Sequence, residues 1–196
     1  MKVNINFFIF IILTSLVPLS ILATQTSAIA QDSSSVPQTG QTQSYALGDD
    51  GDLQKGVQWP DPRFTDNGDG TVTDNLTKLI WLKNADCFGE KNWNDALDVS
   101  NNLADGQCGL SDGSIPDDWR LSNVRELLSL IDYGNLSPPL PSGHPFVDVQ
   151  SGYYWSSTSS VFNSFTAWFV STLSGYVSTL DKSDYNAYVW PVRSAD

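Results

Sequence analysis

The spacing of hydrophobic positions changes several times along the chain, and each change predicts a different element. Two short β-prone runs, 63–66 and 71–74, flank the sequence NGDG at 67–70. Two Asx-Gly steps between such runs predict a tight hairpin. The continuous apolar run at 79–82 then predicts a buried strand.

Helical spacing follows in two segments. Asn92 is expected to cap one helix, whose apolar or small positions are Trp93, Ala96, Leu97 and Ser100. Asn123 is expected to cap the other, because Glu126 three residues later completes a capping-box pattern. The second helix is expected to end near 133–135, and its apolar face is expected at Val124, Leu127, Leu128 and Ile131.

Beyond Pro145 the pattern becomes that of strands. Candidate strands lie at 153–156, 166–171, 176–180 and 188–192, separated by Ser, Asn, Gly and Asp. Because helices come first and strands later, the pattern favours an α+β domain with an antiparallel sheet.

The N-terminal region has the composition of a secretory signal. Lys2 precedes an apolar run from 7 to 22, and the Ala-Ile-Ala sequence at 28–30 offers a small-residue cleavage site. The sequence therefore predicts a signal peptide over 1–30, with a transmembrane anchor as the alternative.

The next segment, 31–57, is rich in Ser, Gln, Thr and Gly and poor in large apolar residues. Such a composition buries too little surface to offset its ordering entropy, so a flexible leader is expected there. All seven tryptophans lie between Trp59 and Trp190, and the globular domain is expected over 58–194.

The charge of the mature chain narrows the range of partners. Residues 1–30 contain one charged residue, Lys2, so its removal leaves nine positive against 22 negative residues, a net charge of −13. Such a chain repels phosphate backbones and anionic lipid surfaces. Nucleic acid is therefore not expected as a partner, nor is membrane insertion after signal cleavage. An extracellular protein or a neutral glycan is expected instead.

The two cysteines, Cys87 and Cys108, both lie in the mature part. In an oxidising compartment they predict one disulfide. Closing the loop between them is expected to stabilise the folded state by about 3 kcal/mol in the chain-entropy model. A redox pair or a metal site is the alternative, although redox pairs usually sit two residues apart and metal sites need more ligands.

Residues 153–193 have an unusual composition, with eleven aromatic residues and four charged ones among many Ser, Thr, Asn and Gly residues. Tyrosine gives a large contact area for two side-chain torsions, and small polar residues give adaptable hydrogen bonds. The composition is typical of a recognition surface, and it is equally typical of ordinary strands with polar turns.

Other candidate sites have simpler interpretations. Asp66, Asp69 and Asp74 suggest calcium, but their spacing does not fit the helix-loop-helix motif and a hairpin turn accounts for them. His144 is the single histidine and lies between Gly143 and Pro145 in a turn-like context. No catalytic residue, metal or cofactor is expected.

Seven ordered motifs resemble the Lcl C-terminal domain family over about residues 60–194. They are RFTDNGDGTVTDNLT at 63–77, WLKNADC at 81–87, DGQCGLSDGS at 105–114, DWRLSNVRELLSLIDYG at 118–134, HPF at 144–146, YYWSST at 153–158 and YVWPVR at 188–193.

The resemblance implies a C-type-lectin-like fold, here with two helices and a mostly antiparallel sheet. In that fold the first and last strands lie near each other, which would place 63–65 beside 189–193. Members of the family are usually exported and several act in adhesion. Some are targets of diversity-generating retroelements, which rewrite chosen codons near the C-terminus.

The resemblance also separates framework positions from ligand positions. Residues that match the framework are Tyr154, Trp155, Ser156, Ser157, Trp168, Gly175, Val177, Trp190, Pro191 and Arg193. The implied ligand-binding positions lie between them: Ser159, Val161, Asn163, Ser171, Leu173, Tyr176, Ser178, Leu180, Asp181, Asp184, Tyr185 and Asn186.

The function expected from these observations is binding rather than catalysis. The hypothesis is an exported adhesion or recognition domain, located in the periplasm or at the cell surface, that presents an aromatic and polar C-terminal face. An envelope-associated hydrolase or formylglycine-type oxidase, or a structural envelope subunit, is the alternative.

Overall fold

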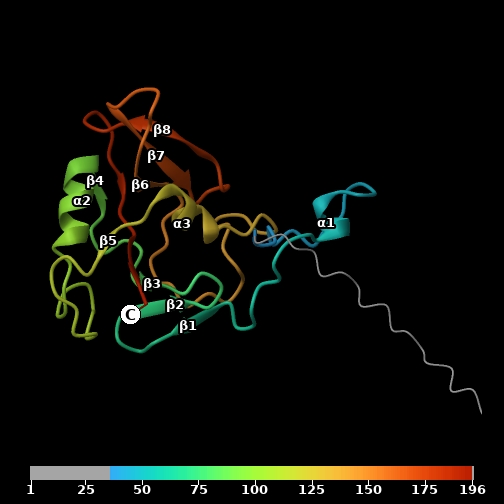
Figure 1. Ribbon diagram of the computed structural model, residues 1–196, viewed down its shortest axis with the longest axis horizontal. Helices are drawn as coiled ribbons and strands as arrows, with labels where there is room; N and C mark the ends of the chain where they lie inside the picture. Colours follow the sequence, from blue (N-terminus) through green and yellow to red (C-terminus); the bar gives the residue numbers. More distant parts are fainter. Residues whose placement is uncertain (1–35, 196) are drawn as a thin grey trace, which may run out of the picture. The chain divides into compact units, whose positions relative to one another are not determined.

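Figure 1 shows the computed structural model of the chain, in which residues 36–195 are described. The predicted signal peptide, 1–30, and the start of the predicted leader lie outside the described residues. The described part is an α+β structure with three short helices and two five-stranded sheets. The expected numbers of helices and sheets, two and one, are therefore wrong. A third helix lies within residues 36–59, and the strands are divided between two separate sheets.

The first sheet has the order β1-β2-β3-β10-β5 and is antiparallel throughout. Its strands are β1 (Phe64–Asp66), β2 (Thr71–Asp74), β3 (Leu79–Leu82), β5 (Arg120–Leu121) and β10 (Pro191–Ser194). The predicted hairpin is confirmed, with Phe64 opposite Asp74.

The resemblance implied that the last strand lies beside the first, and the structure shows that it does not. Strand β10 pairs with β3 and β5, with Val192 opposite both Trp81 and Arg120. The tight turn after β1 confines that strand to the sheet edge, whereas β3 carries the buried Trp81 and Leu82 and forms the centre of the sheet.

The second sheet has the order β4-β9-β6-β7-β8. It consists of β4 (Glu90–Lys91), β6 (Tyr153–Ser159), β7 (Thr166–Ser171), β8 (Val177–Asp181) and β9 (Ala187–Tyr188). Its pairs are antiparallel except for the parallel contact between β6 and β9.

The predicted strand at 188–192 is interrupted in the structure. Ala187 and Tyr188 belong to the second sheet, while β10 belongs to the first. Val189 and Trp190 lie between the two strands, and both are buried. The chain crosses from one sheet to the other at these residues because each side chain packs into a different hydrophobic cluster.

Helices cover both faces of the second sheet. Tyr154 and Val170 pack in the same cluster as Leu127 of α3 (Val124–Ser129). Trp155 and Phe169, on the opposite face, share a cluster with Ala96 of α2 (Trp93–Asn101). The β6–β7 part of the sheet is therefore packed against α3 on one face and against α2 on the other.

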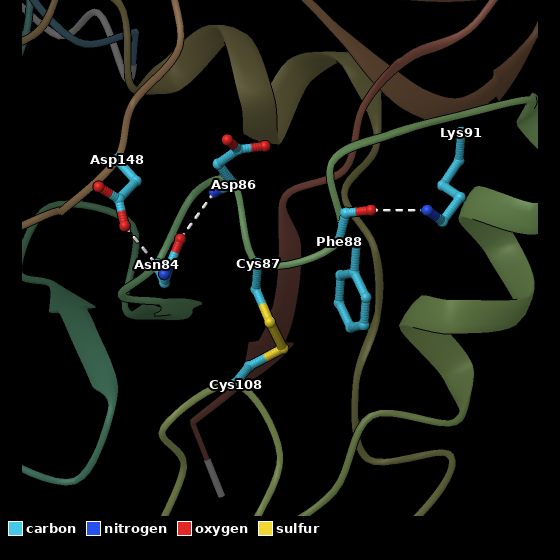
Figure 2. Close-up of a disulfide and its surroundings, with 7 residues drawn as sticks. All are labelled: Asn84, Asp86, Cys87, Phe88, Lys91, Cys108 and Asp148. Atoms are coloured by element: carbon cyan, nitrogen blue, oxygen red, sulfur yellow. Dashed lines mark hydrogen bonds between the residues drawn. A yellow bond between two sulfur atoms is a disulfide. The ribbon is translucent and has the colours of Figure 1, made fainter.

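The predicted disulfide is confirmed, and it closes the loop that contains α2. Cys87 and Cys108 are 5.7 Å apart at their Cα atoms. Figure 2 shows that Asn84 Nδ2 donates a hydrogen bond to Asp148 close to Cys87, and that Lys91 Nζ donates to the Phe88 carbonyl just beyond it. The predicted helix cap is also confirmed, since the Asn92 side chain accepts a hydrogen bond from the Asp95 amide.

Helix α3 begins with the predicted capping box. The Asn123 side chain accepts hydrogen bonds from the Arg125 and Glu126 amides, and the Glu126 carboxylate accepts one from the Asn123 amide. The helix ends at Ser129, earlier than expected, and Leu130 and Ile131 remain buried beyond its end. Hydrophobic spacing continues past the helix because the chain still faces the core there.

Replacing Asn123 with alanine is expected to lower the free energy of unfolding by about 1 kcal/mol, because the first amides of α3 lose their acceptor. Denaturant unfolding measures this loss. The matched control is Asn101→Ala, at an exposed position of α2, where a change within about 0.5 kcal/mol is expected. Equal effects at the two positions would contradict the assigned cap.

Residues 36–59 make more contacts than the composition of a flexible leader suggests. Pro37 and Val57 form a parallel bridge, and α1 (Asp50–Leu53) lies between them in sequence. The Tyr133 amide donates a hydrogen bond of 2.9 Å to the Thr39 carbonyl. Within the described residues, this segment is attached to the chain that follows α3. Among all the described residues, 36–195, no helix is long and apolar enough to span a membrane.

Candidate functional site

The candidate site is the surface formed by strands β6, β7 and β8 and by the loops that join them and lead to β9. In Figure 1 these strands lie at the end of the domain opposite the β1–β2 hairpin. Of the twelve predicted ligand positions, eleven are partly or fully exposed and one, Ser171, is buried with 2% of its surface accessible.

The framework positions are placed differently. Six of the ten predicted framework residues are buried: Tyr154, Trp155, Ser156, Gly175, Trp190 and Pro191. The remaining four are partly exposed: Ser157, Trp168, Val177 and Arg193. The Trp190 indole donates a hydrogen bond of 2.9 Å to the Leu82 carbonyl, and the Trp155 indole donates one of the same length to the Lys91 carbonyl. Both rings therefore tie distant segments together beneath the surface.

Strand pairing places the alternating ligand positions of β8 on one face. Ser178 is opposite Phe169 and Leu180 is opposite Ala167, so their side chains point to the same side of the sheet. Leu180 is half-buried against the α2 cluster and is partly committed to the core.

Tyr176 and Leu173 come from the turn between β7 and β8 rather than from a strand. The Tyr176 ring lies 6.1 Å from the Phe169 ring, and more than half of its surface is exposed. Leu173 is similarly exposed. Ser171 is buried, and its hydroxyl accepts a hydrogen bond from the Leu173 amide. Ser171 therefore stabilises the turn between β7 and β8.

A depression of about 300 Å³ gathers residues from several parts of this surface. Ser171, Leu173 and Asn186, three of the predicted positions, line it together with Glu90 and Tyr153. Glu90 and Tyr153 were missed by sequence reasoning. Strand alternation places Tyr153 on the same face as the buried Trp155, and its ring lies 4.5 Å from the Phe169 ring, so alternation alone would not have indicated that Tyr153 is exposed.

The β6–β7 loop presents the most exposed apolar side chains of the surface. Val161 and Phe162 are fully exposed, and Phe165 is 75% exposed. Only Val161 was among the predicted positions. The Asn163 side chain accepts a hydrogen bond from the Phe165 amide and shapes the loop.

Lys182 joins this loop to the β8–β9 loop. Its ammonium donates hydrogen bonds of 2.7 Å to the Ser159 hydroxyl and 2.9 Å to the Ser164 carbonyl. It also lies 4.0 Å from the centre of the Trp93 ring, on α2. One lysine therefore holds two ligand-position loops against a helix of the core, which reduces the entropy that binding would otherwise cost.

The β8–β9 loop carries Asp181, Asp184, Tyr185 and Asn186. Hydrogen bonds from the Ser183 amide and hydroxyl hold the pKa of Asp181 below its usual value. Asp181 is thereby engaged in the turn, whereas Tyr185 has about half of its surface exposed.

Two cavities lie outside this surface. One, of about 420 Å³, is lined by residues that include Trp59, Asp132 and Asn135. Burial raises the pKa of Asp132 above its usual value, against the opposing effect of hydrogen bonds from Gly134 and Asn135. The other, of about 230 Å³, is lined by residues that include Arg63 and His144. Burial lowers the pKa of the His144 imidazole.

The aspartates considered for calcium have other partners. Asp74 pairs with Arg63, Asp66 pairs with Lys83, and Asp69 accepts hydrogen bonds from the Thr71 amide and hydroxyl. Across residues 36–195 no group of three or more His, Cys, Asp and Glu side chains is arranged to hold a metal ion.

Comparison with known proteins identifies the matched region. A family model described as the Lcl C-terminal domain matches residues 70–193, more than half of the chain. The match begins within the β1–β2 hairpin and ends in β10, and it contains the whole candidate surface. No curated protein matches the chain.

Proposed function

The chain belongs to the Lcl C-terminal domain family, and we propose that it is an exported ligand-binding domain. Its ligand would be an extracellular protein or a neutral glycan, bound at the β6–β7–β8 surface and its loops. The disulfide indicates an extracytoplasmic location. The proposal includes the C-type-lectin-like fold that the resemblance implies and a location in the periplasm or at the cell surface.

The observation that carries the proposal is the contrast between a buried frame and an exposed set of aromatic and polar side chains. Trp155 and Trp190 are fully buried, while Phe162, Tyr176 and Tyr185 are exposed by more than half. Exposed aromatic side chains on a rigid support are typical of binding surfaces, because they bury large areas at a small entropic cost.

The same contrast supports descent from diversified proteins. Eleven of the twelve ligand positions are at least partly exposed, so substitutions there leave most core contacts intact. A reverse-transcriptase gene beside a near-copy of the 3′ end, differing at adenines, would establish diversification.

Binding accounts for the described residues better than catalysis does. Both cysteines are joined in the disulfide, which leaves no free thiol for a formylglycine-type oxidase. Glycoside hydrolysis usually uses two carboxyl groups on either side of the scissile bond. Among the described residues, Asp132 is the one acid that lines the 420 Å³ cavity.

A structural envelope subunit would be expected to bury a broad apolar face in an assembly. The most exposed apolar side chains of residues 153–193, Val161, Phe162 and Phe165, instead lie on one loop beside polar residues such as Asn163, and the other exposed ones are spread over separate turns and strand ends. This arrangement favours recognition of a separate ligand.

The test replaces two tyrosines of the surface. Tyr176→Ala with Tyr185→Ala is expected to weaken binding at least tenfold, because truncation of a central aromatic contact commonly costs about 2 kcal/mol. Binding is measured on whole cells and on arrays of neutral glycans and extracellular proteins.

Tyr45→Ala is the matched control, since Tyr45 is 81% exposed and lies in the N-terminal segment, away from the candidate surface. Binding by this variant is expected to equal that of the original protein. Unchanged binding by the double tyrosine variant would show that the proposed surface is wrong.

A further inference from the structure

The N-terminal segment, residues 36–59, packs against the chain that follows α3. A cavity of about 420 Å³ lies there, which is within the size range of small-molecule sites. Gln38, Gln58 and Trp59 line it from the N-terminal segment, and Asp132, Asn135 and Ser142 line it from the other side. The N-terminal half of this lining lies outside the matched family residues.

Specific contacts hold the two halves together. The Trp59 indole donates a hydrogen bond of 2.9 Å to the Gln38 carbonyl, so the ring is fixed against its own segment. The Tyr133 amide donates to the Thr39 carbonyl across the junction. Gly40 has a φ of +88°, and a Cβ there would overlap both the Asp132 carboxylate and the Trp59 ring. The cavity wall is therefore closely packed and depends on a glycine at this position.

The polar groups of the cavity can both donate and accept hydrogen bonds. Asp132 is 7% exposed, and its carboxylate accepts hydrogen bonds of 2.8 Å from the Gly134 amide and the Asn135 side chain. A carboxylate offers about four lone-pair sites, so these two hydrogen bonds use about half of them. The Gln58 amide and the Ser142 hydroxyl add both donors and acceptors. Asn135 donates to Asp132 and to the Leu140 carbonyl, and Gln38 donates to the Gln54 carbonyl, so these two side chains offer the ligand their amide oxygens as acceptors.

The charges around the cavity disfavour an ionic ligand. The Arg63 guanidinium, which is paired with Asp74, lies 4.7 Å from the centre of the Trp59 ring and occupies one face of that indole, where a ligand cation would otherwise bind. Asp132 is the only charged residue in the described lining and opposes an anion. A neutral ligand with several hydroxyl groups meets neither repulsion, and an aromatic ring beside amides and a carboxylate matches its apolar and polar faces.

We propose that this cavity, formed by Trp59, Asp132, Asn135 and the glutamines of the N-terminal segment, binds a neutral saccharide unit. The site is separate from the β6–β7–β8 surface and does not depend on it. A saccharide hydroxyl donates to the free lone pairs of the Asp132 carboxylate, and the Trp59 ring contacts the C–H face of the sugar.

The test is a titration of the mature chain followed by ¹H–¹⁵N NMR. The probes are methyl β-D-glucopyranoside, methyl β-D-galactopyranoside and N-acetyl-D-glucosamine, with methylammonium and acetate as charged probes. At least one saccharide is expected to cause saturable shifts of the Trp59 indole and of the Gly134 and Asn135 amides. Asp132→Asn is expected to weaken this binding about tenfold, since hydrogen bonds to charged groups contribute about 1.5–3 kcal/mol.

Gln58→Ala provides a second variant whose fold is not in question, because Gln58 is exposed. It is expected to weaken the same binding severalfold. Tyr176→Ala is expected to leave it unchanged, which separates this site from the surface of the proposed function. The proposal is overturned if none of the saccharides shifts these resonances, if methylammonium or acetate binds there more tightly, or if Tyr176→Ala abolishes the shifts.

Discussion

Replacing Asp74 with asparagine is expected to destabilise the protein by about 3–5 kcal/mol, the usual cost of breaking a buried ion pair from one side. Asp74 is fully buried, and its two carboxylate oxygens accept hydrogen bonds of 2.9 Å from Nε and Nη2 of Arg63. Asparagine would leave the buried Arg63 guanidinium without its paired carboxylate.

Asp74 also organises the turn that follows β2. Its carboxylate accepts hydrogen bonds from the Leu76 amide and the Thr77 hydroxyl, at 2.9 and 2.7 Å. Arg63 in turn donates to the Ser129 carbonyl at the end of α3. Loss of the carboxylate therefore affects both the hairpin and its attachment to α3, and chemical denaturation followed by fluorescence measures the combined cost.

The same hairpin supplies a matched control. Asp66 pairs with Lys83 at 2.7 Å, but the side chains are 39% and 31% exposed. Asp66→Asn is therefore expected to cost no more than about 1 kcal/mol, because solvent screens exposed pairs. Similar losses for the two substitutions would show that burial does not distinguish these pairs.

Replacing both cysteines with serine is expected to lower the free energy of unfolding by about 3 kcal/mol, because the unfolded chain gains the entropy of an open loop. The bond spans 21 positions and encloses α2, whose Ala96 packs with Trp155 and Phe169 on one face of the second sheet. Unfolding curves of the oxidised protein and the Cys87→Ser, Cys108→Ser variant measure the difference.

A reductant supplies the control for this prediction. Treating the original protein with dithiothreitol is expected to shift its unfolding midpoint to that of the double serine variant, and the variant itself is expected not to respond. If the oxidised and serine forms unfold at the same denaturant concentration, the bridge has no stabilising role.

Part of the fold follows from short-range patterns. The hairpin at 64–74, the strand at 79–82 and both helix N-termini agree with the structure, because turn residues and caps act on neighbours a few positions away. The motifs also predicted the family correctly, since they are ordered along most of the matched region.

The candidate surface was predicted less completely. The sequence indicated which third of the chain to examine and most of its exposed positions, but it missed Phe162, Phe165, Tyr153 and Glu90. It also placed Ser171 among the ligand positions, although that residue is buried. Composition identifies a region rich in aromatic residues, whereas the direction of each side chain depends on the pleat and on what covers it.

The sequence by itself determined the local elements, the disulfide partners and the family. Only the tertiary structure decided that the segment at 187–194 is shared between two sheets, that residues 36–59 pack against the chain after α3, and that this packing forms an open cavity. The physical reason is distance along the chain. The Trp190 indole donates a hydrogen bond to a carbonyl 108 positions away, whereas sequence patterns report only on residues a few positions apart in a helix or strand.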